Sequence, residues 1–346
     1  MHLKDIIIEN DCAEFPLSKR LRRAFQDVAA TTCREVAADD ESLCLLHECS
    51  GDISRMKSTV IVSKKKGYSI EKVGAGTGNP ACDYDIEFIY GCPHKCAFCQ
   101  QLCSYEETPY IAIYPDLQRI LLAVQETVHR AGQFPIIFEA GNMTDLLALE
   151  PTTGFLQEMI SFWAKELNSK ARLHFLTKSN QVQNILGLDH RGAVRIGFSL
   201  NLPEFTQRYE LETASIDQRF EAIRAVLQSG YRLHLSFSPI IYRDGALERY
   251  EKLFAETKAF LLSCDGFDES DLTVEALILF QKQGGPRLMR LHYPLFADEL
   301  MRHWKRHRVR SEYRHLYPQH LYDKLRSFLN DCFDRYFPLA RVLFIS

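Results

Sequence analysis

The sequence lacks any apolar run of about 18–20 residues, the length that a helix needs to cross a bilayer. We expect no secretory signal peptide either, since the first eleven residues, MHLKDIIIEND, are too short and too acidic for one. We therefore expect a cytoplasmic protein with no membrane partner.

A large excess of one charge is absent too, because 42 Lys and Arg face 45 Asp and Glu, a formal net charge of -3. This balance excludes a protein that binds polyanions through its overall charge, but it leaves room for a local basic patch. We find no repeats and no low-complexity linker. The 346 residues suit one large domain with appendages, or two domains.

Cysteine, by contrast, is plentiful. Eleven cysteines are an odd number in a long chain, which argues against a secreted disulfide framework and favours a metal or redox role. The pair Cys44 and Cys49 could indicate a metal site of its own. Buried structural cysteine is the better interpretation of those in the N-terminal part.

Apolar strand patterns and helical periodicities alternate from about residue 84 onward. The predicted strands are Ile86–Tyr90, Pro135–Ala140, Arg172–Thr177, Val194–Leu200, Leu233–Ser238 and Leu272–Phe280. The predicted helices are Leu117–His129, Leu156–Leu167, Val182–Leu186, Ile216–Ser229 and Leu247–Leu262. This alternation predicts an α/β fold whose parallel strands curl into a barrel or an open partial barrel.

The chain divides into three predicted segments. Residues 1–80 form a small N-terminal α/β region, which ends in the turn-forming run Gly74 to Pro80. Residues 81–285 form the partial barrel, and residues 286–346 a basic segment with a closing helix and strand. Polar residues follow the barrel strands directly: Cys92, Asn142, Thr144, Lys178 and Asn201. Functional groups of such barrels lie at these strand ends.

Cys92, Cys96 and Cys99 give a C-x3-C-x2-C spacing just after the first of these strands. Three thiolates on one short loop can hold three corners of an iron–sulfur cube, which leaves the fourth iron open. Zinc is an alternative, but a structural zinc site needs a fourth ligand, for which His94 and Cys103 are the nearest candidates. Three unrelated core cysteines are the remaining interpretation.

This motif at the start of a βα series resembles that of the radical S-adenosylmethionine enzymes, and Phe98 before the last cysteine fits the same loop. The resemblance implies a partial (β/α)6 TIM-like barrel of the radical SAM type. It also implies two cofactors, a 4Fe-4S cluster and S-adenosyl-L-methionine, which together produce a 5′-deoxyadenosyl radical.

A closer resemblance is to the spore photoproduct lyase family. It rests on collinear stretches: Phe138 to Asp145, Leu176 to Lys178, Arg195 to Asn201, Arg208 to Ala222, Gly230-Tyr231, Ser238 to Tyr242 and Arg335 to Pro338. Members of that family are lyases that open a thymine-dimer lesion of the 5-thyminyl-5,6-dihydrothymine type in DNA. The implied partners are damaged DNA and an electron donor such as flavodoxin or ferredoxin.

By this resemblance Cys92, Cys96 and Cys99 are the cluster ligands, and Thr144, Lys178 and Ser199 hold S-adenosylmethionine. A Lys ammonium suits the methionine carboxylate, and hydroxyls suit its oxygens. We add Phe98, Glu139 and Asn201 as candidate cofactor contacts. The alternatives are a solvated loop for Lys178, and ordinary polar satisfaction inside a barrel for Ser199 and Asn201.

Two departures from the family concern hydrogen return. Asn142 stands where the lyases carry the cysteine that gives a hydrogen atom to the product radical, and an amide cannot donate hydrogen as a thiol does. Phe98 and Gln100 replace tyrosines that flank the last cluster cysteine in the lyases. Cys103 and Tyr105, on the same loop, are candidate substitutes.

Met301–His320 is strongly basic and interleaved with aromatic residues. Its candidate DNA contacts are Arg302, Lys305, Arg306, Arg308, Arg310 and Tyr313. Such clusters bind phosphates and help to extrude bases, while the alternative is a solvated basic helix face. Two other functions stay open: a radical enzyme of this family with another substrate, and a DNA-lesion-binding protein that has lost catalysis.

Overall fold

The computed structural model of the protein describes residues 3–25, 28, 31–37, 52–73, 82–104, 109–309 and 312–346. The chain forms two compact units. Unit 1 consists of Met1–Lys95 and Tyr105–Arg195, and unit 2 of Cys96–Ser104 and Ile196–Ser346. The predicted boundaries at residues 80 and 285 stay a prediction, and the Gly74 to Pro80 turn lies outside the described residues. No helix in the described ranges is long and apolar enough to cross a membrane.

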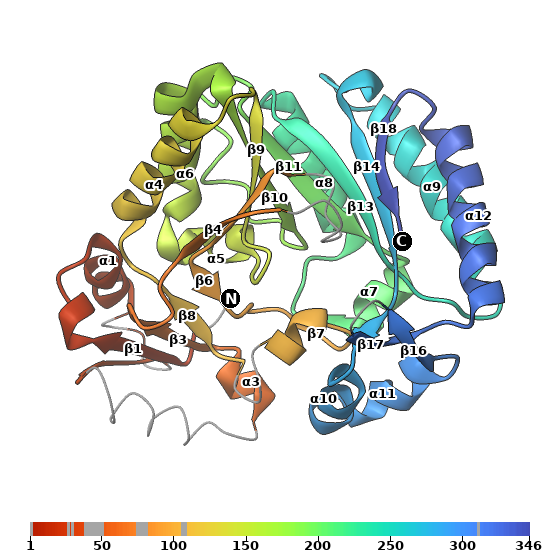
Figure 1. The fold of residues 1–346 in the computed structure, drawn as a ribbon, viewed down its shortest axis with the longest axis horizontal. Helices are drawn as coiled ribbons and strands as arrows, with labels where there is room; N and C mark the ends of the chain where they lie inside the picture. Colours follow the sequence, from red (N-terminus) through yellow and green to blue (C-terminus); the bar gives the residue numbers. More distant parts are fainter. Residues whose placement is uncertain are drawn as a thin grey trace. The chain divides into compact units, whose positions relative to one another are not determined.

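One sheet of unit 1 is built mostly from the N-terminal part. Its strands, in spatial order, are β2 (Thr32–Val36), β1 (Asp5–Glu9), β3 (Thr59–Val62), β8 (Ile111–Ile113) and β6 (Ile89–Tyr90) (Figure 1). The isoleucine run of β1 is buried on both faces, as expected for an inner strand with a parallel partner on each side. Two helices accompany this sheet, α1 (Pro16–Phe25) and α3 (Ile53–Met56).

The other strands of unit 1 run in the order β4 (Ser69–Lys72), β5 (Tyr84–Glu87), β9 (Ile136–Ala140) and β10 (Ala171–Thr177). The last three are parallel, and β4 is an antiparallel edge. Their helices are α4 (Leu117–Arg130), α5 (Leu146–Thr153) and α6 (Phe155–Phe162). After α6 a π-helical turn, Trp163–Leu167, buries Trp163 edge-on against Phe138 of β9, with ring centroids 5.9 Å apart.

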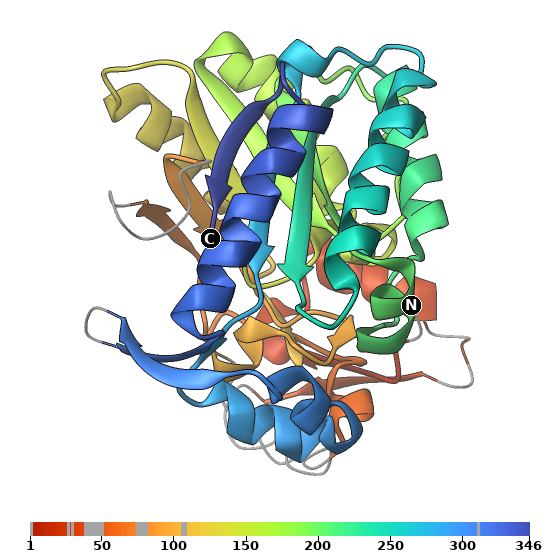
Figure 2. The ribbon, with the colours of Figure 1, turned by 90° about the vertical axis from the view of Figure 1, so that its right-hand side faces the viewer.

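The strands of unit 2 run in the order β11 (Val194–Leu200, whose first two residues count with unit 1), β13 (Arg232–Ile240), β14 (Thr273–Ile278) and β18 (Arg341–Ile345). The last three are parallel. The helices α8 (Ile216–Gln228), α9 (Ala246–Leu262) and α12 (Gln319–Tyr336) lie side by side over these strands (Figure 2). Phe254 of α9 joins them, because it stacks on Phe237 of β13 at 4.0 Å and packs against Phe333 of α12 at 5.2 Å.

The rest of unit 2 holds α7 (Pro203–Tyr209), α10 (Gly285–His292), α11 (Pro294–Met301) and a small antiparallel sheet. That sheet has the order β15 (Gln281–Lys282), β17 (Glu312–Leu316) and β16 (Lys305–Val309). Most of the basic stretch is thus a β-hairpin, with Lys305 opposite Leu316 and Arg308 opposite Tyr313. The alternative of a basic helix face is wrong for this segment.

Two predicted elements differ from the structure. Residues 182–186 form turns and no helix. Val182 and Ile185 have a helical spacing, which led to the prediction, but here both are buried side chains of a loop. The predicted strand Ile86–Tyr90 is two strands, since β5 pairs with β9 whereas β6 pairs with β8 of the other sheet. The chain therefore changes sheets at Phe88, shortly before the cysteine motif.

Candidate active site

The cysteine loop begins at a glycine that the fold requires. Gly91 follows β6 with φ +95, and a Cβ there would lie 2.1 Å from the Tyr110 carbonyl oxygen. None of Cys92, Cys96 and Cys99 is in a disulfide; Cys96 is buried, and the other two are half-buried. The division between the units falls after Lys95, so Cys92 counts with unit 1 and the other two with unit 2. The side chain of Cys103 lies outside the described part, as does Tyr105.

Within unit 1 a buried lysine holds the beginning of this loop. Lys57 is 1% exposed, and its Nζ donates to the backbone carbonyls of Cys92 and His94 at 3.2 and 2.7 Å. The lysine stands 35 residues before Cys92, at the end of the short helix α3. No local pattern in the sequence indicates this contact.

Asp145, at the N-cap of α5, accepts hydrogen bonds from three separate segments of unit 1. His94 Nε2 lies 2.9 Å from one carboxylate oxygen, and Thr177 Oγ1 lies 2.8 and 3.0 Å from the two. The backbone N–H of Lys178 donates at 2.8 Å and that of Ala148 at 3.0 Å. Burial would raise the pKa of Asp145, but the hydrogen bond and attraction of His94 hold it below the usual value.

The predicted cofactor contacts of unit 1 lie at the ends of β9 and β10. Glu139 is 6% exposed, and Lys178 is half-buried beside Thr177. The hydroxyl of Thr144 is buried and has no hydrogen-bond partner in the described part of the chain. An unsatisfied hydroxyl at a strand end is a group that a polar ligand would satisfy.

Asn142, at the place of the family's donor cysteine, contacts a half-buried carboxylate that the sequence did not indicate. Its side chain hydrogen-bonds Asp85 of β5, and Asp85 also accepts from the Cys82 thiol, with Sγ and Oδ1 3.4 Å apart. Ligand atoms of Cys82, Asp85 and Glu139 all lie within 4.8 Å of one another. Burial, together with the charges of Glu139 and Asp85, raises the pKa of Cys82 well above its usual value, so this thiol stays protonated.

Glu87 of β5 gives a prediction about pH. It is 9% exposed, and burial raises the pKa of its carboxyl from 4.5 to about 8, despite a backbone N–H from Met143 at 3.4 Å. The folded state keeps this proton between pH 4.5 and 8 while the unfolded state loses it, so stability falls across that window as pH rises. Glu87→Gln removes this dependence, and we expect it to raise the free energy of unfolding at pH 8 by on the order of a few kcal/mol.

Urea unfolding of both proteins at pH 5 and pH 8 measures the effect. The free energy of unfolding of the variant should exceed that of the parent by much more at pH 8 than at pH 5. An equal change at the two pH values would contradict the raised pKa of Glu87.

In unit 2 the predicted contacts Ser199 and Asn201 lie on either side of Leu200, the last residue of β11. Ser199 is 2% exposed, and its hydroxyl donates to the Ser238 carbonyl at 3.1 Å. Asn201 is fully buried; its amide donates to the Pro239 carbonyl at 3.0 Å and accepts from the Tyr250 hydroxyl at 2.9 Å. These bonds satisfy Asn201 within the protein.

A buried ion pair fixes the strand end that carries Ser199. Arg219 of α8 donates to the Ser199 backbone carbonyl at 2.7 Å and to the Glu210 carboxylate at 2.6 Å, and neither side chain of the pair is exposed. Phe98 is 6% exposed, and its carbonyl accepts from the buried Gln281 amide. The sequence indicated Arg219 and Glu210 only as family-like residues, with no role.

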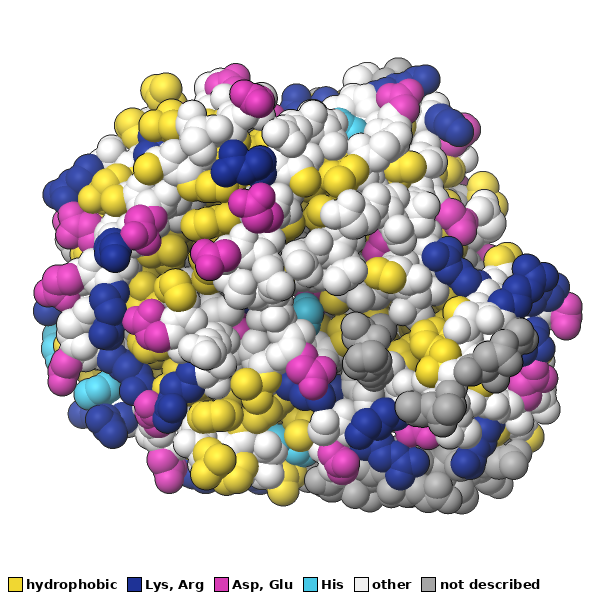
Figure 3. All heavy atoms as spheres, turned by 180° about the vertical axis from the view of Figure 1, so that it is seen from behind, with side chains coloured by type: hydrophobic (Ala, Val, Ile, Leu, Met, Phe, Trp, Pro, Cys, Tyr) yellow, Lys and Arg dark blue, Asp and Glu magenta, His cyan; other side chains and the backbone are white. Residues whose placement is uncertain are grey.

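The hairpin β16–β17 presents three of the predicted DNA contacts to solvent: Lys305, Arg306 and Arg308. None of the ion pairs found among the described residues involves them or Arg302, while Arg310 lies outside those residues. Arg306 lies 4.0 Å from the centroid of the Tyr313 ring, which is 40% exposed. On the face shown in Figure 3, basic and acidic side chains are mixed.

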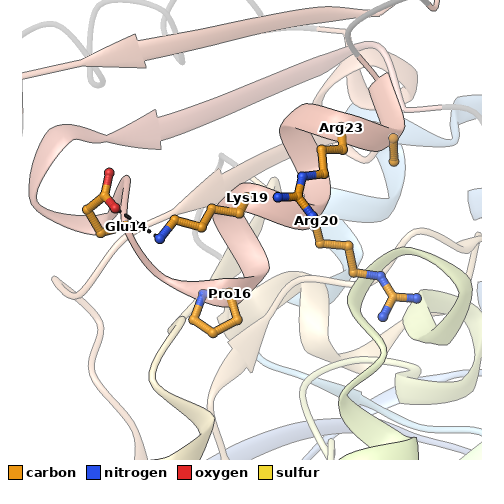
Figure 4. A pocket seen from close by; sticks show the side chains of 6 residues that line it. Glu14, Pro16, Lys19, Arg20 and Arg23 are labelled. Atoms are coloured by element: carbon orange, nitrogen blue, oxygen red, sulfur yellow. Dashed lines mark ion pairs between the residues drawn. The ribbon is translucent and has the colours of Figure 1, made fainter.

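An open depression of about 590 Å³ lies beside α1, far in the sequence from the predicted site residues. Its lining is Glu14, Pro16, Lys19, Arg20, Arg23 and Ala24 (Figure 4). Glu14 and Lys19 pair across it at 2.9 Å. None of the predicted site residues lines it, and we assign it no function.

Comparison with known proteins decides the family. The family model described as spore photoproduct lyase matches residues 2–346. The chain belongs to the spore photoproduct lyase family. The predicted family is therefore confirmed, and so is the predicted class of enzyme, a radical S-adenosylmethionine lyase.

Relatives named spore photoproduct lyase match almost end to end. The protein of Geobacillus sp. (strain Y412MC61) is 27% identical over 99% of this chain and 98% of its own, and that of Bacillus subtilis (strain 168) 26% identical over 99% and 97%. A solved spore photoproduct lyase variant with bound AdoMet and dinucleoside spore photoproduct has a TM-score of 0.85 at 24% identity, covering 99% of both chains. This likeness confirms the predicted α/β fold class of the radical SAM type.

Proposed function

We propose that this member of the spore photoproduct lyase family reverses a thymine-dimer lesion of the 5-thyminyl-5,6-dihydrothymine type in DNA. The observation that carries the proposal is the loop with Cys92, Cys96 and Cys99, spaced C-x3-C-x2-C after β6 and outside any disulfide, in a chain that matches the family over residues 2–346. Similar solved lyases hold dinucleoside spore photoproduct, which supports the substrate class.

The residues fit the two proposed cofactors. Thiolates are the usual ligands of iron–sulfur clusters. The buried hydroxyl of Thr144 could form a hydrogen bond with a polar group of S-adenosylmethionine, since it has no partner among the described residues. Bound together, a 4Fe-4S cluster with one open iron and S-adenosyl-L-methionine supply a 5′-deoxyadenosyl radical that abstracts hydrogen from the substrate. In this proposal Lys178 faces the methionine carboxylate, while Ser199 contributes a hydroxyl and Glu139 a carboxylate acceptor for the amino group.

Hydrogen return is proposed to use the cluster loop, through Cys103 or Tyr105. The donor's S–H or O–H bond breaks as a C–H bond forms on the product radical, and the radical left on the donor recovers a hydrogen atom from 5′-deoxyadenosine. We expect Cys103→Ala to lower the yield of repaired thymine per cofactor cleaved severalfold, because the product radical then lacks its thiol donor.

Cys82→Ala is the matched control, because Cys82 is a buried thiol beside Asp85. Unchanged yield with Cys103→Ala would contradict the role of Cys103. A loss with Cys82→Ala instead would assign the donor to the thiol that reaches Asn142 through Asp85.

Asn142 also favours a second candidate, a radical enzyme of the same family that acts on another nucleobase. A DNA-lesion-binding protein without catalysis is the third. The test is anaerobic incubation of iron-loaded protein with dithionite, S-adenosylmethionine and a dinucleoside spore photoproduct. Recovered thymidine supports the lyase; 5′-deoxyadenosine without thymidine favours another substrate, and lesion binding without cofactor cleavage favours the third.

A further inference from the structure

We propose that Asp145 is a positioning residue that couples the cysteine loop to the strand end carrying Lys178. The proposal rests on the proposed function, because it assigns the loop to the cluster and Lys178 to S-adenosylmethionine. It adds a residue that touches neither cofactor but sets the geometry between the segments that do.

The contacts of Asp145 exceed what a helix cap requires. Two other Asp N-caps in the described chain accept only from their own helices: Asp116 from the Arg119 N–H at 3.1 Å, and Asp52 from the Ser54 and Arg55 N–H groups. Asp145 caps α5 through Ala148 in the same way. It then also accepts from His94 in the cysteine loop and from Thr177 and Lys178 at the end of β10.

The partner in the loop is held from two sides. His94 stands between Cys92 and Cys96 and is 7% exposed. Its ring nitrogen meets Asp145 at 2.9 Å, and its backbone carbonyl accepts from Lys57 at 2.7 Å. Side chain and main chain of the same residue are thus both fixed, which leaves this part of the loop little freedom to shift.

A carboxylate is needed because every group around it donates. Asp145 is 4% exposed and offers two oxygens to four donors. Asn in its place keeps one acceptor oxygen, which still caps α5, but turns an NH2 group toward the Lys178 N–H or the His94 ring. A buried donor left without an acceptor is costly, so the β10 end and the cysteine loop should separate.

Asp145→Asn tests the coupling, and Asp116→Asn is the matched control, since it makes the same change at the cap of α4. Both are rebuilt with iron and sulfide in the full chain. We measure the rate of iron loss to a chelator, the affinity for S-adenosylmethionine, and the EPR spectrum of the reduced cluster with and without that cofactor. We expect Asp145→Asn to lose iron faster and to bind S-adenosylmethionine more weakly, each by about tenfold or more. Its EPR spectrum should also change less when S-adenosylmethionine is added. Asp116→Asn should match the parent in all three measurements.

Thr177→Val serves if Asp145→Asn does not fold, because it leaves the carboxylate in place and removes the β10 hydroxyl from it, together with the acceptor of the Ser179 N–H. It should weaken cofactor affinity severalfold while iron loss stays unchanged. Equal EPR response, iron loss and affinity in the parent and in the Asp145 and Thr177 variants would overturn the coupling. Failure of the unaltered protein to hold iron or the cofactor would instead overturn the proposed function, so the two failures are distinguishable.

Discussion

Replacing any one of Cys92, Cys96 and Cys99 by Ala is expected to abolish reductive cleavage of S-adenosylmethionine. A cluster held by three thiolates has no spare ligand, so the loss should exceed the roughly 10–100-fold effect of removing a residue that merely supports a metal ligand. Iron and sulfide content after anaerobic reconstitution, together with 5′-deoxyadenosine formed per chain, measures it.

The matched control is Cys264→Ala, a free and buried cysteine of unit 2 whose thiol donates to the Phe260 carbonyl. This variant should keep its iron and its cofactor cleavage. If all four variants retained iron equally, the loop would not be the cluster site. If the loop variants lost zinc instead, the structural zinc alternative would hold.

Removing the exposed charges of β16 is expected to weaken DNA binding strongly. Lys305, Arg306 and Arg308 are exposed on the hairpin, and none of the ion pairs of the described chain includes them. Each lost phosphate contact lowers the slope of log affinity against log salt by about 0.9 for duplex DNA. The triple Ala variant should therefore lose about tenfold or more in affinity at low salt, with a slope smaller by up to about 3.

A second triple variant controls for net charge. Arg130→Ala, Arg191→Ala and Lys252→Ala remove the same charge from exposed ion pairs with Glu126, Asp189 and Glu256. Fluorescence anisotropy with a lesion-containing duplex, from 50 to 200 mM salt, compares the two. Similar affinities and slopes for both triples would show that overall charge, and not the hairpin, governs binding.

The sequence predicted the alternating strands and helices well because each one is bounded by its own apolar pattern. Val194–Leu200 was predicted with the bounds of β11, and Ile216–Ser229 differs from α8 by one residue. The residue pattern of the hairpin, taken by itself, indicated only a basic stretch. Its residues are charged rather than β-branched, so local propensity did not indicate strands.

Contacts between distant segments could not be predicted. Lys57 reaches the cysteine loop from 35 residues away, and Asp145 meets His94 from 51 residues away. Asp145 was visible only as part of a family-like stretch, and the Cys82, Asp85 and Asn142 contacts depend on the pairing of β5 with β9. Such contacts arise from strand register, which a single sequence specifies only through the whole fold.

EPR spectroscopy of the anaerobically rebuilt, reduced protein tests the central claim most directly, since it probes whether one iron is left for the cofactor. The account predicts about four irons per chain and a cluster signal that changes when S-adenosylmethionine is added. Zinc in place of iron, or a cluster signal indifferent to S-adenosylmethionine, would contradict it.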